Sequence, residues 1–432
     1  MIIRMRLFFR SMARATAVAI ALLVWTSACV TSPGAGSAVD DAIATRARLF
    51  NPETVPSELV EALRSHRLVL FGESHYVQEH QDFVVLLLQE LHPHGLRWFA
   101  EELSHASGWA VDDYVRGRRD DPPPSVARMN QTYLIGLRAF NATLPPSERI
   151  RFRYIDMNHN PTAFRTSLQM MKRETDLSPV EAEITAVLAL DPYEEEYLDA
   201  LHALERSARL MDATDAAAEP GVGAALRDRA GDRWFHRLRE TLEIEIRSFA
   251  LRLQWDVADR ERIMIDLVHA ILDESDNDMV TVNTGMFHAQ RQRFMGTRQE
   301  WLGEYLARNP QLTEGAEPGS HSGFCSIAFF GMRGERIRHS RDQNPQPMRP
   351  LAELPQHNLS RRIADAAGAA AGGGEIPAVF LPLDHPAFDR RMLVSYGFSP
   401  VRAIPARQFD AFVVYPEVSV LRSLQATWYT AP

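Results

Sequence analysis

The feature that most constrains the fold of this chain is the alternation, from about residue 55 onward, of short apolar runs with longer amphipathic stretches. The apolar runs have the length and composition of buried strands, and they are VLFG (69–72), LRWFAEE (96–102), IRFRYIDM (150–157), MVTVNTG (279–285), CSIAFFG (325–331) and FDAFVVYP (409–416). Strands that alternate with helices build βαβ units and a largely parallel sheet. We therefore expect an α/β fold in which a mostly parallel central sheet is flanked by helices.

A long stretch with helical periodicity and no strand pattern separates the third apolar run from the fourth. It contains PVEAEITAVLAL (179–190), EEEYLDALHALERSARLM (194–211) and the segment 233–272, with a loop at 212–225. We therefore expect a large helical insertion or cap at residues 165–275, which divides the α/β core into 51–164 and 276–432. In the second part, the proline-rich segment 344–355 and the low-complexity segment 366–375 are expected to be irregular.

The N-terminus has the pattern of a secretory signal peptide at residues 1–28. A basic segment is followed by ATAVAIALLVW, an apolar run too short to span a bilayer, and then by small residues before Cys29. A cysteine at this place resembles the lipobox of bacterial lipoproteins, whereas ordinary cleavage after Ala28 is the alternative. We expect export and lipid anchoring through Cys29 in the bacterial cell envelope, in the outer membrane or periplasm, with residues 29–50 as a tether.

The overall charge argues against a nucleic-acid partner. The formal net charge is −9 with acidic and basic residues mixed along the chain, whereas nucleic-acid binders usually present a basic face. The chain has two cysteines. With Cys29 lipidated, Cys325 would have no partner for a disulfide, and its place in the run CSIAFF favours a buried free thiol over a nucleophile.

Polar side chains cluster where four of the apolar runs end. They are Glu73 and His75 just after the first run, Glu101 and Glu102 at the end of the second, Asp156 near the end of the third with His159 just beyond it, and His288 shortly after the fourth. The carboxyl ends of parallel strands lie on one edge of a sheet, and open α/β folds bind their ligands at this edge. We therefore expect these side chains to form one site.

Each of these residues also has a structural interpretation when it is taken alone. Glu73 and Asp156 could cap the helices that follow them, because a carboxylate is favoured by exposed helical amides. His75 and His288 could be surface loop histidines. The two adjacent glutamates of the second run could face opposite sides of their strand, one inward and one toward solvent.

A cationic side chain could complete this edge. Arg260 lies in the helical pattern DRERIMIDLV and shares a face with Met264 at i, i+4. From there its guanidinium could hold a carboxylate or a substrate oxyanion. An ion pair with Asp256, four residues earlier in the same helix, is the alternative.

Six segments of the chain, taken in their order along the sequence, are similar to those of a known protein family. They are VLFGESHYVQEH, RWFAEE, RFRYIDM, DRERIM, MVTVNTGMFHAQR and FDAFVVYPEVSVL, and they span roughly residues 60–425. Their order resembles that of the erythromycin-esterase/ChaN-like superfamily. The most specific parts are the Gly-Glu…His element after the first run and the Gly-x-x-His element after the fourth. The resemblance implies an erythromycin-esterase-like lipoprotein.

The esterase branch of this superfamily implies a carboxylic ester or lactone hydrolase that acts on a small molecule without metal or cofactor. By this resemblance, His75 is the general base that deprotonates a water, and Glu73 or Glu102 orients it. His288 and Arg260 would stabilise the oxyanion that develops on the carbonyl. The sequence contains no G-x-S-x-G nucleophile elbow, which favours direct attack by water.

Four further residues are expected to support this chemistry. Asp156 would orient one of the catalytic partners, and Glu101 is counted with the same catalytic set. Tyr76 and His159 are expected to contact the substrate, and the helical insertion would cover the site and select substrates.

Two other functions remain open on the sequence. A ChaN-like lipoprotein could bind haem through exposed tyrosine or histidine ligands without catalysis, and Tyr76 is a candidate ligand. Alternatively, glutamates and histidines at strand ends could coordinate a divalent metal for hydrolysis, although the sequence contains no HExxH motif.

Overall fold

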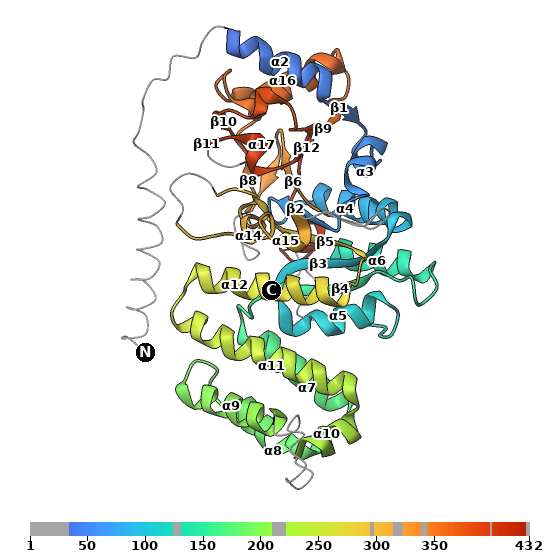
Figure 1. Cartoon of the computed structure of the whole chain (residues 1–432), viewed down its shortest axis with the longest axis vertical. Helices are drawn as coiled ribbons and strands as arrows, with labels where there is room; N and C mark the ends of the chain where they lie inside the picture. The colour runs from blue at the N-terminus through green and yellow to red at the C-terminus, as the bar shows by residue number, and fades with distance from the viewer. Residues whose placement is uncertain are drawn as a thin grey trace. The chain divides into compact units, whose positions relative to one another are not determined.

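The computed structural model describes residues 34–123, 131–209, 222–293, 298–313, 323–337, 344–397 and 400–428 (Figure 1). The predicted signal peptide, the predicted lipidation site Cys29 and residues 212–221 of the expected loop lie outside these ranges. In the part of the chain that is described, no helix combines the length and the apolar composition needed to cross a bilayer.

A large sheet forms the centre of the fold, and within the described ranges its eight strands lie in the order β1-β9-β12-β6-β2-β5-β3-β4 (Figure 1). The strands are β1 (Arg48–Phe50), β2 (Leu68–Glu73), β3 (Leu96–Ser104), β4 (Arg151–Asp156), β5 (Met279–Gly285), β6 (Phe324–Gly331), β9 (Ala378–Pro382) and β12 (Ala411–Tyr415). The strands from β12 to β4 are parallel to their neighbours, whereas β9 is antiparallel to β12 and β1 is antiparallel to β9. The prediction of a mostly parallel α/β sheet is confirmed.

The central strands β2 and β5 are buried along their whole length. Parallel sheets that are covered on both faces favour such continuous apolar runs. The first helices around the sheet are α3 (Ser57–Leu63), α4 (Gln78–Leu91), α5 (Gly108–Val115) and α6 (Gln131–Ala142). The strand register pairs Glu73 with Gly285 and Glu101 with Asn283, so the polar ends of neighbouring strands lie at the same edge.

The predicted helical insertion is present between β4 and β5. Its helices are α7 (Pro161–Glu174), α8 (Glu181–Ala189), α9 (Glu195–Arg209), α10 (Val222–Ala230), α11 (Asp232–Leu253) and α12 (Val257–Glu274). Helices α7 to α11 contribute to an apolar core of their own, which includes Phe164, Leu201 and Phe235. The segment 233–272 is two helices rather than one, because the chain breaks at 254–256 and Asp256 caps α12 by accepting hydrogen bonds from Ala258 N and Asp259 N.

Short elements complete the second part of the core. They are α13 (Met286–Ala289), α14 (Leu302–Leu306), α15 (Pro310–Thr313), β7 (Glu335–Arg336), β8 (Gln346–Pro347), α16 (Leu359–Ala371), β10 (Met392–Val394), β11 (Val401–Ala403), α17 (Pro405–Gln408) and α18 (Arg422–Trp428). Cys325 on β6 is a buried free thiol.

Regular structure occurs in the expected tether and in both segments that were expected to be irregular, of which the proline-rich segment 344–355 contains strand β8. In the expected tether, Gly34–Arg46 forms helix α2 and β1 pairs with β9, because the side chain of Phe50 is buried against Phe83. The low-complexity segment 366–375 begins inside helix α16. Alanine has the highest helix propensity, and α16 is capped by Asn358 at its start and by the left-handed Gly372 at its end.

Candidate active site

The side chains at the ends of β2, β3, β4 and β5 meet at one edge of the sheet and form two linked groups. The first group is centred on Glu73, the last residue of β2, which is buried. Its Oε1 accepts a hydrogen bond from His75 Nδ1 (2.9 Å), and its Oε2 lies 2.9 Å from His80 Nε2. Helix α4 starts later, with Val77 at its cap, so Glu73 orients histidines rather than capping a helix.

A closed network of buried polar groups holds this first group in place. His80 Nε2 lies 2.8 Å from Asn283 Oδ1, and Asn283 Nδ2 donates to the hydroxyl of Tyr133 (3.2 Å). The Tyr133 hydroxyl in turn lies 3.4 Å from Glu73 Oε2. Burial and the negative charge of Glu73 raise the pKa of Tyr133 well above its ordinary value, so this hydroxyl stays protonated and donates to the carboxylate.

The two histidines keep Glu73 ionised although it is buried. Burial opposes the charged form, but the charge and hydrogen bonds of His80 and His75 outweigh it and lower the pKa of Glu73 to about 2. The pKa of His75, by contrast, is raised. Loss of hydration lowers its pKa, but the hydrogen bond to Glu73 and the charge of Glu102 raise it above the ordinary 6.5. His75 can therefore take up a proton near neutral pH.

His75 presents its second nitrogen to the sheet edge. Because Nδ1 donates to Glu73, the neutral ring carries its lone pair on Nε2, and the side chain is 46% exposed. The Nε2 atom lies beside the backbone of Gly285, where a Cβ atom would come within 2.8 Å of it. Glycine at the end of β5 is therefore required for this ring position.

The second group is an ion-pair network around Arg260. Its Nε donates to Asp156 Oδ1 (3.0 Å), its Nη2 lies 2.5 Å from Asp156 Oδ2, and the same Nη2 pairs with Glu102 Oε1. The other oxygen of Glu102 accepts from Gly285 N (2.6 Å). Arg260 thus pairs across the sheet edge and not with Asp256, and Asp156 does not cap α7, whose cap is Asn160.

Both carboxylates of this network are ionised. Burial favours the neutral forms, but His288 and Arg260 hold the pKa of Glu102 well below its ordinary value. In the same way, Arg260 and His159 outweigh the burial of Asp156 and lower its pKa to about 2.

His288, on α13, is buried between two carboxyl groups. Its Nε2 lies 3.3 Å from Glu102 Oε1, and its Nδ1 lies 2.6 Å from Glu261 Oε1. Burial alone would lower the pKa of His288, but Glu102 and Glu261 raise it to about 10. His288 is therefore an imidazolium at neutral pH, although it also lies 3.3 Å from Arg260 Nη1. The site thus holds one exposed histidine that can act as a base and one buried histidine that carries a charge.

The other predicted residues lie at different distances from this centre. The expectation that one of the adjacent glutamates 101 and 102 is solvated is wrong, because Glu101 is 6% exposed and the Glu102 side chain is 7% exposed. Strand β3 is an inner strand of the sheet, between β5 and β4, and both side chains are buried there. Glu101 contributes to the raised pKa of Tyr133, which places it on the Tyr133 side of the strand.

His159 and Tyr76 lie at the margin of the site. His159 Nε2 lies 2.6 Å from Asp156 Oδ2, and its half-exposed ring stacks on Trp255. Tyr76 has a positive φ of 67°, which is unusual for an aromatic residue. It packs against a small apolar cluster that includes Val420 and Leu421.

Three site residues were missed in the sequence. His80 and Glu261 stand close in sequence to His75 and Arg260, so their nearness along the chain was the available signal. Tyr133 lies on helix α6 and does not follow a predicted strand, so the strand-end pattern could not indicate it. Its partners Glu73 and Asn283 are far from it in sequence, so only the fold brings it to them.

Most polar side chains of the site are paired within the protein, although the buried His80 Nδ1 has no hydrogen-bond partner in the described part of the chain. Among the described residues, no three or more His, Cys, Asp or Glu side chains are grouped as metal ligands would be. What the arrangement can do by itself is proton transfer at His75 and stabilisation of negative charge by Arg260 and His288.

The chain matches a known protein family. A family model described as erythromycin esterase matches residues 91–418, a span that includes Glu102, Asp156, Arg260 and His288 and begins after β2. Sequence comparison finds no match among curated proteins.

Three solved structures are similar in fold. A protein from Bacillus cereus has 14% identity and a TM-score of 0.65 over 89% of this chain and 98% of its own. A succinoglycan biosynthesis protein has 13% identity and a TM-score of 0.65 over 91% of this chain and 100% of its own. A mutant of erythromycin esterase EreC in its open conformation has 14% identity and a TM-score of 0.61, over 87% of this chain and 98% of its own.

Proposed function

Because the chain belongs to the erythromycin esterase family, we propose that it is a hydrolase in which a water molecule attacks the carbonyl carbon of an ester or lactone. The observation that carries the proposal is the position of His75. Its Nδ1 is held by the ionised Glu73, its side chain is 46% exposed, and its Nε2 lies at the same edge as the cationic pair of Arg260 and His288. A base and an oxyanion site next to each other are what hydrolysis of a carbonyl requires.

In the first step, Nε2 of neutral His75 takes a proton from the water as its oxygen bonds to the carbonyl carbon. The ring becomes an imidazolium, which the carboxylate of Glu73 stabilises across the 2.9 Å hydrogen bond. The carbonyl π electrons move onto oxygen, and the resulting oxyanion is stabilised by the positive charges of Arg260 and His288.

In the second step, the tetrahedral intermediate collapses. The carbon–oxygen bond to the leaving group breaks, and His75 returns its proton to the departing alkoxide. The products are a carboxylic acid and an alcohol, which stay in one molecule when the substrate is a lactone. Glu102 and Asp156 hold Arg260 in place during both steps.

The test is turnover of a panel of esters and lactones, macrolides included, by the purified full-length protein. Wild type should hydrolyse at least one substrate, and His75→Ala should lower kcat by about 10²- to 10⁴-fold, the range for loss of a general base. Added imidazole should partly restore the activity of His75→Ala, because it supplies the missing base. His288→Gln should lower kcat at similar KM.

The matched control is His202→Ala. His202 resembles His75 because its ring Nδ1 lies 3.3 Å from a carboxylate, that of Glu205, and because its side chain is 40% exposed, but it lies on α9 of the insertion. Its replacement should leave kcat unchanged. A haem titration run in parallel addresses the other class of function. Absence of turnover on the whole panel, together with a Soret shift that is lost in Tyr76→Phe or His75→Ala, would overturn the hydrolase proposal.

We also propose that the protein is exported and anchored in the bacterial envelope through a lipid on Cys29. The support is the small residues that precede this cysteine after a short apolar run. Wild type should enter the detergent phase on phase partitioning and Cys29→Ser should stay in the aqueous phase. Equal partitioning of the two proteins would overturn the anchor.

A further inference from the structure

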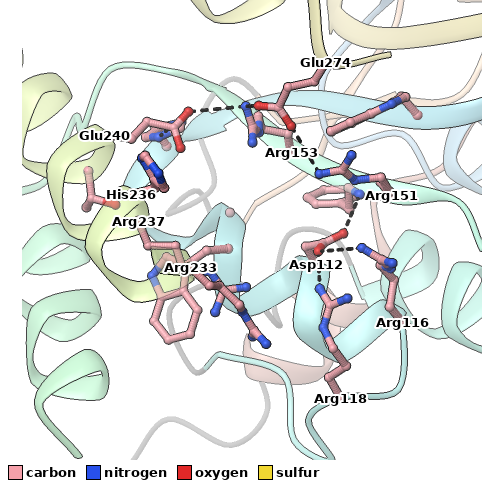
Figure 2. Close-up of a pocket in the computed structure, with 16 residues that line it drawn as sticks. Asp112, Arg116, Arg118, Arg151, Arg153, Arg233, His236, Arg237, Glu240 and Glu274 are labelled. Atoms are coloured by element: carbon pink, nitrogen blue, oxygen red, sulfur yellow. Dashed lines mark hydrogen bonds and ion pairs between the residues drawn. The ribbon is translucent and has the colours of Figure 1, made fainter. Parts of the chain in front are cut away.

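A cavity of about 360 Å³ lies next to β4, the last strand of the sheet, and is lined by residues of α5 and α11 (Figure 2). Asp112 on α5 accepts a hydrogen bond from Phe152 N of β4 (2.9 Å), so α5 covers the open edge of this strand. None of the residues placed in the candidate active site lines this cavity. The cavity is therefore separate from the candidate active site.

The cavity concentrates positive charge. Its lining contains the arginines Arg116, Arg118, Arg151, Arg153, Arg233 and Arg237, and Figure 2 shows Arg233 and Arg237 on one side and Arg116, Arg118 and Arg151 on the other. The lining contains three carboxyl groups, those of Asp112, Glu240 and Glu274. The buried Asp113 adds a fourth behind the wall, where it pairs with Arg118, Arg233 and Arg237.

Six guanidinium groups therefore face four carboxyl groups, an excess of two positive charges in a chain whose net charge is −9. Ion pairs inside the protein do not account for this excess. Clefts lined by one sign of charge attract ligands of the opposite sign.

Two of these guanidinium groups are incompletely bonded. Arg116 and Arg151 each have a buried Nε that finds no acceptor within the described part of the chain. Arg116 approaches Asp112 only at 3.6 Å through Nη1, and Arg151 uses one Nη2 bond of 3.1 Å to Glu274. Because these nitrogens are buried, a ligand in the cavity would contact the remaining, partly exposed portion of the two side chains, which are 22% and 38% exposed.

The arginines are held in place by aromatic rings. The guanidinium carbon of Arg151 lies 3.8 Å from the ring centre of Trp98, and that of Arg237 lies 4.9 Å from the ring centre of Trp109. Such stacking fixes the plane of the group, so little conformational freedom is lost when it binds an anion. Burial lowers the pKa of Arg151, the carboxylates of Glu274 and Asp112 oppose this effect, and the positive charge of Arg153 adds to it.

We propose that this cavity binds a small organic phosphate, with the phosphate dianion between the arginines of β4, those near the end of α5 and those of α11. Guanidinium groups that approach from three elements suit a tetrahedral dianion, whose oxygens accept in several directions. At the volume of water in the liquid, about 30 Å³ per molecule, the cavity has room for about twelve waters. It is therefore large enough for an organic group beside the phosphate. This inference is independent of the proposed hydrolysis.

The test is calorimetric titration of the full-length protein at low salt with glucose 6-phosphate, inorganic phosphate, succinate and glucose. Glucose 6-phosphate should bind with sub-millimolar Kd and quench tryptophan fluorescence, because Trp98 and Trp109 line the cavity. Inorganic phosphate should bind more weakly, and glucose should not bind. Raising the salt concentration should weaken binding, because the attraction is between charges.

The variant is Arg116→Gln combined with Arg151→Gln, which should weaken glucose 6-phosphate binding by about tenfold or more for each lost charge-assisted bond. Arg116→Gln alone is the second variant, since it leaves the pair of Arg151 with Glu274 intact. The matched control removes two exposed arginines outside the cavity, Arg333 and Arg407, whose carboxylate partners are Glu417 and Asp389.

The outcomes separate clearly. Weaker binding in the cavity variants with unchanged binding in the control supports the proposal. Absence of binding at millimolar glucose 6-phosphate, equal binding in cavity variants and control, or tighter binding of succinate than of glucose 6-phosphate would each overturn it.

Discussion

Replacing Glu73 with glutamine tests the centre of the site, because this carboxylate is bonded to two histidines and a tyrosine. Its pKa is lowered from the ordinary 4.5 to about 2 in the folded protein. At about 1.4 kcal/mol per unit of pKa, ionised Glu73 contributes about 3 kcal/mol to the free energy of unfolding at pH 7. Glutamine has a similar shape but cannot ionise, so Glu73→Gln should lose a contribution of this size.

The pH dependence gives the sign of this effect. A carboxyl group whose folded pKa is depressed stabilises the fold above its unfolded pKa, and the stabilisation is lost as pH falls through the folded pKa. The stability difference between wild type and Glu73→Gln should therefore be largest above pH 4.5 and should shrink toward pH 2. Near pH 3 we expect about 1 kcal/mol, less than half of the value at neutral pH.

The assay is urea unfolding followed by tryptophan fluorescence, for wild type and variant, at a series of pH values from 7 to 3. Glu417→Gln is the control, because Glu417 forms an exposed pair with Arg333, and such pairs contribute less than about 1 kcal/mol. A stability difference for Glu73→Gln that stays constant between pH 7 and pH 3 would refute the reasoning. The same variant should lower kcat by about 10²- to 10⁴-fold, because His75 loses the group that fixes its tautomer.

Three further predictions concern the reaction. The plot of kcat/KM against pH should be bell-shaped. The value falls at low pH as His75, whose pKa is above 6.5, is protonated, and it falls at high pH as His288 loses its proton near pH 10. A flat profile between pH 6 and pH 10 would contradict the two roles. Gly285→Ala should strongly lower kcat with unchanged thermal stability or a small loss, because the added Cβ would lie 2.8 Å from His75 Nε2 and displace the ring; full activity in this variant would show that the ring position is not required. Turnover should persist in excess EDTA, and its loss on chelation with recovery on adding zinc would point to a metal-dependent reaction instead.

The sheet could be anticipated from the sequence because its strands are fully buried and therefore appear as continuous apolar runs, as MVTVNTG does at 279–285. The position of the site followed from topology, since parallel strands end at one edge. Strand β9 (Ala378–Pro382) was missed because it is short and follows a segment of low complexity. Its pairing with β12 depends on a partner that is distant in the chain.

The finer features depended on tertiary contacts. Spacing alone leaves open whether Arg260 pairs with Asp256 in its own helix or with Asp156, and the structure shows the second because Asp256 caps α12. The arginine-lined cavity takes its residues from β4, α5 and α11, which are separated in sequence. The sequence therefore does not reveal this cluster of arginines, because along the chain the arginines alternate with acidic residues.

The balance of charge at the sheet edge has a consequence for turnover. Glu73, Glu102 and Asp156 are ionised there, and they outnumber the two cations Arg260 and His288. In the proposed reaction the oxyanion forms while His75 is an imidazolium, which adds a third cation and balances the three carboxylates. The product carboxylate remains after His75 has returned its proton, when the carboxylates again outnumber the cations. At close range like charges repel by about 1 to 4 kcal/mol, depending on solvent access. The newly formed acid should therefore be expelled readily, which would make such an enzyme insensitive to inhibition by its own product.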